Sequence, residues 1–317
     1  MVIRVSPNAQ GLIAKSFLKK FEPILGKESK TFFESLTWFL PKTIRVNTLK
    51  ASEQSIVRFL QNSNSKFEKI EFLDHAFFVS SNFEVISKSL EHELGLIQIM
   101  SASAMIPVIA LDPKVNETVL DLTAAPGNKT IMLAQFMGNQ GLLIANESDE
   151  VRLKRMRIHL LKNGVTNCLL THQDGIQFDV GLKFDKILLD APCSSDGEIN
   201  KTINQLKDWS QEKVIKFQEL QKQLMVHAFD LLKPGGELVY STCTFSPEEN
   251  EDIVQFLLDS KKDAHTVSIK LKGLKGTLPL EQYNGKRYSF EVRNCLRIWP
   301  YKHNLEGFFV GKIKKSE

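Results

Sequence analysis

The chain has 317 residues, of which 42% are hydrophobic and 25% are charged, and 41 Lys and Arg against 37 Asp and Glu give a formal net charge of +4. This composition is that of an ordinary globular protein and excludes a disordered, collagenous or low-complexity chain. The length exceeds the ~250–300 residues at which single cores stop growing, so we expect one large domain and a smaller one.

The charge is unevenly distributed along the chain. Residues 1–60 carry ten basic and four acidic residues, residues 61–259 carry 18 and 28, and residues 260–317 carry 13 and five. Two basic ends around an acidic centre suggest a polyanion as partner, with nucleic acid the first candidate, although solvated surface lysines would produce the same counts.

Neither a membrane-spanning run nor a signal peptide is evident, so we expect a cytoplasmic protein without membrane association. The cysteines are too few and too widely spaced for a disulfide scaffold, and we expect reduced thiols. We also predict a monomer without a metal site. The four cysteines are Cys168, Cys193, Cys243 and Cys295.

The first 90 residues predict two small units. Apolar residues at helical spacing, among them Phe17, Phe21 and Phe32, predict a helical segment over residues 1–40 that ends near Pro41. A small α+β unit is then expected over residues 41–90. Its predicted elements are a strand at 43–47, a helix at 55–61 and strands at 69–73 and 75–79.

Residues 91–317 are predicted to form the large domain, in which strands and helices alternate. This alternation indicates a doubly wound, mainly parallel α/β sheet, which places its ligands at the carboxyl ends of the strands. The predicted strands cover residues 119–122, 141–145, 168–172, 184–190 and 237–241, and the predicted helices cover 129–136, 149–163 and 212–232.

Candidate ligand-binding residues follow these strands. The first turn combines small residues with a helix N-terminus, which suits the approach of a carboxylate or phosphate. A tight turn without a ligand would show the same sequence. The turn consists of Thr123, Ala124, Ala125, Pro126, Gly127 and Asn128. Acidic residues stand at or near four successive strand ends, at Asp121, Glu147, Asp174 and Asp190. An acid such as Glu147 suits ribose hydroxyls. The lack of a full GxGxxG motif and the acid at the third strand favour S-adenosylmethionine over a dinucleotide.

Two cysteines also follow strands. Cys193 comes after Asp190 and Cys243 after Thr242, both among polar, turn-forming neighbours, whereas Cys168 and Cys295 lie in apolar patterns typical of buried thiols. If both strands are central, both thiols reach one cleft, where a thiolate could add to an electron-poor ring.

At these residues the chain resembles the RsmB/Nop/Sun family of S-adenosylmethionine-dependent RNA cytosine-5 methyltransferases. The resemblance implies a Rossmann-like doubly wound methyltransferase sheet with a smaller N-terminal α+β, RRM-like, RNA-binding region. The matching blocks are residues 45–50 (RVNTLK), 95–107 (GLIQIMSASAMIP), 119–130 (VLDLTAAPGNKT), 190–194 (DAPCS), 233–244 (KPGGELVYSTCT), 297–300 (RIWP) and 307–309 (GFF).

The resemblance also assigns roles. It implies that Cys243 is the nucleophile, that Cys193 helps to resolve the covalent adduct and that Asp190 hydrogen-bonds the cytosine ring, with Lys129 in support. In the cofactor site it implies that Glu147 binds the ribose and Asp174 the adenine amino group. Arg152, on the following helix, is expected to make a supporting contact there.

Some positions depart from the family pattern. Thr123 stands where a Cys or another small residue is common, and Asn128 where a Gly is common, but both are small enough to leave the turn usable. After Cys193 the family usually continues Ser-Gly-x-Gly with an Arg a few residues on, and residues 195–201 contain no Arg. That change concerns RNA contacts.

Other classes fit less well. A DNA cytosine-5 methyltransferase uses a Pro-Cys nucleophile, but the second motif at Cys243 argues against it. An amino-group methyltransferase would need an Asn/Asp-Pro-Pro-aromatic motif, and a non-catalytic RNA-binding relative would not need both cysteines.

RNA is therefore the expected partner. The target cytosine must leave its stack or lie in a loop. The compact chain favours transfer RNA over ribosomal RNA. We expect the RNA backbone to be held by the basic C-terminal stretch and by Lys15, Lys19, Lys20, Lys27, Arg45 and Lys50.

Overall fold

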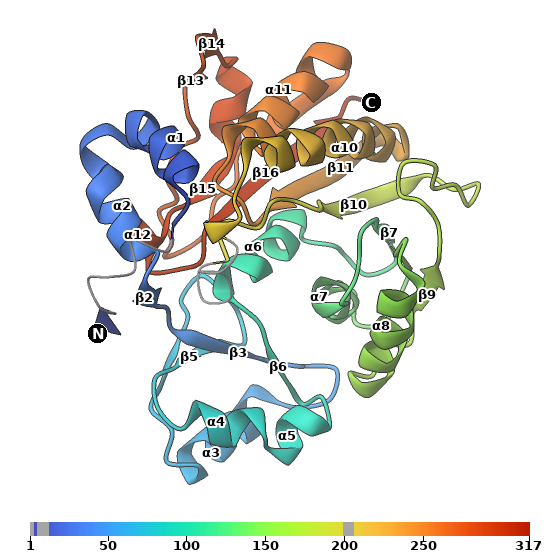
Figure 1. Cartoon of the computed structure of the whole chain (residues 1–317). Coiled ribbons are helices and arrows are strands. Elements are labelled where there is room, and N and C mark those ends of the chain that lie inside the picture. Colours follow the sequence, from blue (N-terminus) through green and yellow to red (C-terminus); the bar gives the residue numbers. More distant parts are fainter. Residues whose placement is uncertain (1–2, 5–12, 199–205) are drawn as a thin grey trace.

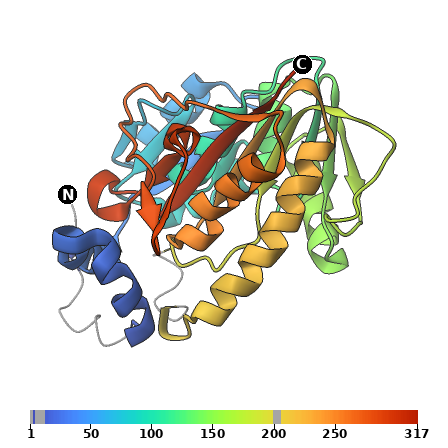
Figure 2. The same ribbon diagram turned by 90° about the horizontal axis from the view of Figure 1, so that it is seen from above.

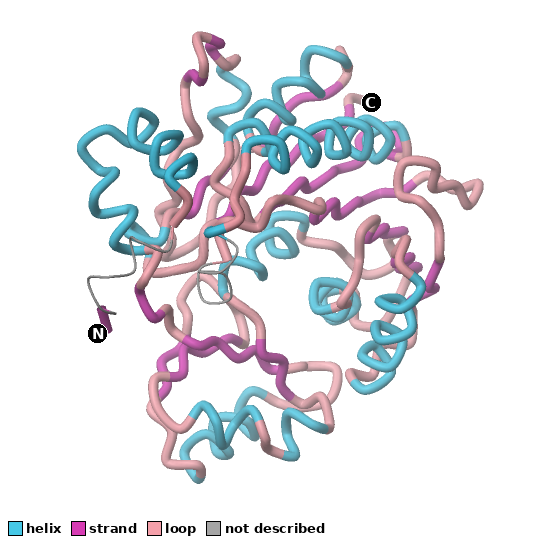
Figure 3. Tube along the Cα trace, viewed as in Figure 1, coloured by secondary structure: helices cyan, strands magenta, loops and turns pink. Residues whose placement is uncertain are grey.

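The computed structural model describes residues 3–4, 13–198 and 206–317 and contains two main sheets (Figures 1 and 3). The larger sheet belongs to the C-terminal domain and the smaller one to the N-terminal region. The expected architecture, a Rossmann-like sheet with a small N-terminal α+β unit, is confirmed. No helix within the described ranges has the length and apolar character needed to cross a bilayer.

The large sheet has the strand order β9-β8-β7-β10-β11-β16-β12, and β15 pairs with β16. Strands β7 to β11 are parallel neighbours, whereas β16 runs antiparallel to β11 and β12. The bounds are β7 Thr118–Asp121, β8 Leu142–Asn146, β9 Cys168–Thr171, β10 Phe184–Asp190, β11 Leu232–Thr242, β12 Ala264–Val267, β15 Leu296–Ile298 and β16 Phe308–Lys315.

Helices cover both faces of this sheet, because successive strand residues point to opposite sides (Figure 2). Val119 and Leu188 face one core, and their neighbours Leu120 and Leu189 face the other. Helices α6, α7 and α8 pack on the first core, and α10 and α11 on the second. Their bounds are α6 Ala102–Leu111, α7 Asn128–Phe136, α8 Glu150–Lys162, α10 Gln211–Asp230 and α11 Glu251–Ser260.

The small sheet is antiparallel, with the order β4-β5-β3-β6 and helices on one face (Figure 1). In chain order its elements run βαββαβ, with two short helices in the second helical position, as expected for an RRM-like unit. They are β3 Lys42–Val46, α3 Glu53–Asn62, β4 Phe67–Lys69, β5 Ala76–Val79, α4 Phe83–Ser87, α5 Leu90–Glu93 and β6 Ile97–Ile99.

Two details of this unit differ from the sequence-based expectation. The strand expected at residues 69–73 ends at Lys69, because the chain turns between Ile70 and Leu73, where the Leu73 N–H donates to the Ile70 carbonyl. Both side chains are buried in the core of the large domain, so their hydrophobicity reflects an interface and not a strand. The predicted boundary at residue 90 precedes β6, which pairs with β3.

The first helices pack on the large domain. They are α1 Lys15–Leu25, the 3₁₀ turn η2 Gly26–Glu28 and α2 Ser29–Ser35, and a short strand β2 Trp38–Phe39 follows and pairs with β1 Ile3–Arg4. Their aromatic rings pack against rings from distant parts of the chain. The ring centroids of Phe17 and Trp209 are 5.6 Å apart, and those of Phe32 and Phe245 are 4.9 Å apart. The N-terminal helical segment therefore forms a wall of the large domain.

Lys20 reinforces this contact. Its side chain is 7% exposed, and its Nζ donates to Glu248 Oε2 at 2.7 Å and to Gln211 Oε1 at 3.1 Å. Lys20 was expected to hold RNA, and its burial shows that it instead ties α1 to the residues that follow β11.

We predict that Lys20→Met lowers the free energy of unfolding by about 3 kcal/mol, because Glu248 would be left buried without its cation. Chemical denaturation measures this difference. Lys19→Met is the matched control: Lys19 is exposed on the same helix, and its replacement should change stability by less than about 0.5 kcal/mol. Equal effects of the two substitutions would contradict the assignment.

Candidate active site

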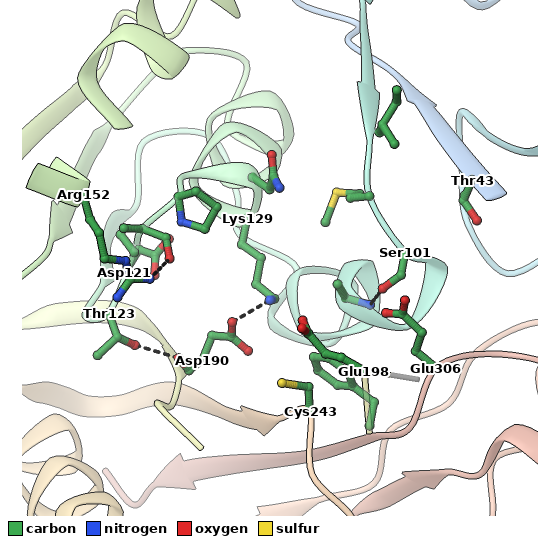
Figure 4. Close-up of a pocket in the computed structure, with 18 of the residues that line it drawn as sticks. Thr43, Ser101, Asp121, Thr123, Lys129, Arg152, Asp190, Glu198, Cys243 and Glu306 are labelled. Carbon is green, nitrogen blue, oxygen red and sulfur yellow. Dashed lines mark hydrogen bonds and ion pairs between the residues drawn. The ribbon is translucent and has the colours of Figure 1, made fainter. Parts of the chain in front are cut away.

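The carboxyl ends of neighbouring strands meet at a cavity of about 400 Å³ (Figure 4). Its wall on the other side comes from the N-terminal sheet, through β3 and the residues after β6. The lining residues are Pro41, Lys42, Thr43, Ile99, Met100, Ser101, Ala104, Asp121, Thr123, Ala124, Ala125, Pro126, Asn128, Lys129, Arg152, Asp190, Glu198, Cys243, Glu306 and Phe308.

Lys129 and Asp190 form an ion pair inside this cavity. Lys129 Nζ lies 2.6 Å from Asp190 Oδ2, and Ser241 Oγ donates to Asp190 Oδ1 at 2.7 Å. Burial acts to lower the pKa of Lys129, but the charge and hydrogen bond of Asp190 outweigh it and raise that pKa. The pair therefore keeps a fixed cation and a fixed anion beside Cys243.

The two predicted thiols lie together. Cys193 Sγ and Cys243 Sγ are 3.3 Å apart, and Ser195 Oγ lies 3.7 Å and 3.5 Å from them. The hydrogen bond with Cys243, together with burial, raises the pKa of Cys193 well above its usual value. Cys193 therefore holds its proton, and Cys243, which lines the cavity, is the sulfur that faces a ligand there.

Residues expected to bind the cofactor surround the first turn. Glu147, buried after β8, accepts from the Asp149 N–H at 2.9 Å and lies 3.3 Å from Arg152. Arg152 also donates to the Ala125 carbonyl at 2.7 Å, and Thr123 Oγ1 donates to the Asp190 carbonyl at 2.9 Å. These bonds fix the turn against α8 and β10.

Other expected residues lie outside the cavity lining. Asp174 is exposed after β9 and accepts from the Ile176 N–H at 3.0 Å. Gly127 has a φ of +99°, and a Cβ there would lie 3.0 Å from Met156 Cγ, so a glycine allows α7 to begin close to α8. Cys168 and Cys295 are apart from the site, and burial raises both pKa values, to about 12 for Cys168.

Of the basic residues expected to hold RNA, Arg45 is also buried. It is 2% exposed, donates to Gln98 Oε1 at 3.2 Å and has its pKa lowered to about 9 by burial. Lys50 is exposed but donates to the Leu94 and Lys162 carbonyls. Lys15, Lys19 and Lys27 are exposed on the N-terminal helical segment and its 3₁₀ turn. The part of residues 195–201 beyond Glu198 lies outside the described residues.

Asp121 is a site residue to which the sequence analysis gave no role, although its position at a strand end was noted. It is 1% exposed, Thr130 Oγ1 donates to its Oδ2 at 2.6 Å, and its Oδ1 has no partner among the described residues. Burial raises its pKa to about 7. The cavity thus contains an unpaired buried carboxyl oxygen, which suits a ligand that carries an amino group or positive charge.

Strand order, helices on both faces and a polar cavity at the carboxyl edge define a Rossmann-like methyltransferase. Residues 108–314 match the family described as 16S rRNA methyltransferase RsmB/F, and residues 13–100 match the N-terminal domain of 16S rRNA methyltransferase RsmF. The chain therefore belongs to the RsmB/F methyltransferase family.

Individual relatives agree. The chain is 40% identical to the tRNA (cytosine(49)-C(5))-methyltransferase of Pyrococcus abyssi, over 96% of each chain. It is 39% identical to the ribosomal RNA small subunit methyltransferase F of a Shewanella species, over 87% of this chain but 57% of that protein. The crystal structure of a methyltransferase homolog from Pyrococcus horikoshii superimposes with a TM-score of 0.87 at 36% identity, covering 98% of this chain and 100% of that one.

The raised pKa of Asp121 predicts a pH-dependent stability difference. Folding raises its pKa from 3.8 to about 7, so the folded protein keeps a proton that the unfolded chain has lost, and wild-type stability falls as the pH rises through this window. The Asn variant lacks this titration. The free energy of unfolding of Asp121→Asn, relative to that of the wild type, should therefore be about 2–3 kcal/mol higher at pH 8 than at pH 5. Denaturation of both ligand-free proteins at the two pH values measures this, and a constant difference would contradict the burial argument.

Proposed function

We propose that the protein transfers a methyl group from S-adenosylmethionine to carbon 5 of a cytosine in RNA. The observation that carries this proposal is the pair of thiols, Cys193 and Cys243, beside the Lys129–Asp190 ion pair. Cytosine C5 is a poor nucleophile, and a covalent thiol adduct at C6 is the means by which C5 becomes reactive. Membership of the RsmB/F family supports the same reaction.

S-adenosylmethionine would supply the methyl group, and the residues at the first turn fit it. The unpaired Asp121 Oδ1 suits its positively charged amino group, and the α7 N-terminus, which has no side-chain cap, suits its carboxylate. Buried Glu147 suits ribose hydroxyls, with Arg152 holding the turn. Asp174 is assigned to the adenine amino group by the family resemblance.

In the proposed reaction the Cys243 thiolate forms a bond to C6 of the cytosine, which makes C5 enamine-like. The proton that Cys243 gives up passes to ring nitrogen 3, whose N–H then donates to the Asp190 carboxylate, and Lys129 holds that carboxylate in place. C5 would then accept the methyl group of bound S-adenosylmethionine, whose sulfur keeps the electron pair of the broken S–CH₃ bond. A base then removes the C5 proton, the C5–C6 double bond reforms and the Cys243 thiolate leaves, with Cys193 assisting this last step.

Transfer RNA is our first choice of substrate. The match with the tRNA methyltransferase of Pyrococcus abyssi extends over 96% of both chains. Ribosomal RNA is the second candidate, since the Shewanella relatives act on it, although the chain covers 57% of the first of them. Exposed Lys15, Lys19 and Lys27 would contact the RNA backbone. We further propose a monomer in the cytoplasm, where free cysteines stay reduced.

Incubation of the purified protein with methyl-labelled S-adenosylmethionine and, separately, bulk tRNA or small-subunit rRNA tests the substrate. Label recovered as 5-methylcytidine in tRNA supports the first choice. Label in rRNA alone would replace it with the second candidate.

We predict that Cys243→Ala abolishes methylation, because no other described cysteine lines the cavity. S-adenosylmethionine binding, measured by calorimetry, should stay within about threefold of wild type, since the side chain that is lost makes no assigned cofactor contact. Retained turnover would overturn the nucleophile assignment.

Cys193→Ala should have a different effect. Without the neighbouring thiol, release of the product should slow, and a protein–RNA complex that survives denaturing gel electrophoresis should accumulate. Cys168→Ala, which removes a thiol away from the site, should produce no such complex. Normal turnover of Cys193→Ala without a complex would reduce Cys193 to a structural thiol.

A further inference from the structure

Behind the two thiols, two loops are joined by a pair of buried carboxylates. We define the Cys193 loop as residues 191–198 and the Cys243 loop as residues 243–249. Asp196 belongs to the first loop and is 1% exposed, and Glu249 belongs to the second and is fully buried. Neither residue lines the active-site cavity.

Asp196 binds the loop that carries Cys243. Its Oδ1 accepts from the Phe245 N–H at 2.6 Å and from Thr244 Oγ1 at 2.9 Å. Its Oδ2 accepts from Trp209 Nε1 at 3.0 Å and from Ser246 Oγ at 3.3 Å. One carboxylate from the Cys193 loop thus accepts bonds from three consecutive residues of the other loop.

Glu249 makes the converse contacts. Its Oε2 accepts from the Ser194 N–H, next to Cys193, at 2.9 Å, and its Oε1 accepts from Ser194 Oγ at 2.5 Å. Gln221 Nε2 donates to the same Oε2 at 2.9 Å and to the Pro192 carbonyl at 2.8 Å. The carboxylate of each loop is therefore bonded to the backbone of the other loop.

We propose that Asp196 and Glu249 are positioning residues that hold Cys193 Sγ and Cys243 Sγ in register for the reaction. The regular ladder of hydrogen bonds between β10 and β11 stops at the strand ends, so side chains help to fix the separation of the two loops that follow. Charge-assisted bonds to backbone N–H groups suit this purpose, because they are short and directional. A separate backbone bond, from the Gly197 N–H to the Cys243 carbonyl at 2.9 Å, supports the same register.

The role of these residues in catalysis rests on the proposed function, but their effect on the thiols can be measured without RNA. Diamide takes two hydrogens from a thiol pair and leaves one disulfide bond. The rate of forming the Cys193–Cys243 disulfide, followed by peptide mass spectrometry in the ligand-free protein, reports how closely the thiols are held. The control is Asp252→Asn, which changes a half-buried carboxylate bonded to Tyr288 and Gln218 and not to either loop.

Asp196→Asn should slow disulfide formation about tenfold and lower kcat about 100-fold, with KM little changed, since a misplacement of about 1 Å costs this much. The NH₂ group of the new amide would replace one of the two carboxylate oxygens. In one orientation it would face the Phe245 N–H donor, and in the other the Trp209 and Ser246 donors, so one set of bonds is lost either way. Glu249→Ala should behave alike. Glu249→Gln should recover both rates to within about fivefold, because its amide oxygen still accepts from Ser194 and Gln221 while its NH₂ donates to the Ser194 hydroxyl.

The proposal would be overturned if folded Asp196→Asn and Glu249→Ala formed the disulfide and methylated RNA at wild-type rates. It would also be overturned if Asp252→Asn lost as much of both rates as these two variants. If either main variant fails to fold by circular dichroism, Ser194→Ala serves in its place, since it deletes one hydroxyl of the same network and should slow disulfide formation. Absence of RNA methylation by the wild type would reject the proposed function and leave the disulfide comparison to decide the positioning role.

Discussion

The active site depends on one constraint: parallel neighbouring strands end at the same edge of a sheet. The register pairs Asp190 with Ser241 and Leu188 with Asp121, so the ends of β7, β10 and β11 lie side by side. Lys129 reaches Asp190 from the helix after β7, and Cys193 and Cys243 follow the other two strands. Residues 50 to 61 positions apart in sequence thereby meet within hydrogen-bond distance.

Burial then sets the chemical character of each group. Lys129 and Asp190 compensate each other, so the site holds opposite charges although the Lys129 side chain is mostly buried and the Asp190 side chain is partly buried. Cys193 keeps its proton because it is buried beside Cys243. Among the described residues Asp121 has no such cation in direct contact, and burial raises its pKa.

Much of this site could be predicted from sequence, because alternating strands and helices imply a parallel sheet and the motifs around Asp190 and Cys243 stand at strand ends. Lys20 and Arg45 were mistaken for RNA contacts, because a count of charges does not show which basic residues are buried in the fold. Lys20 pairs with Glu248, 228 positions away, and Arg45 donates to Gln98 on the adjacent strand. The same limit hid the contacts that Asp196 makes with the Cys243 loop and Glu249 with the Cys193 loop. The turn after Lys69 was read as strand because its hydrophobic residues belong to an interface between domains.

The proposed reaction leaves 5-methylcytosine in RNA. Bisulfite sequencing of total RNA, from cells that carry the gene and from cells that lack it, tests this most directly. We expect one or a few cytosines, in tRNA first, that resist conversion when the gene is present and convert when it is deleted or carries Cys243→Ala. Identical bisulfite profiles in all three strains, with the protein expressed, would contradict it.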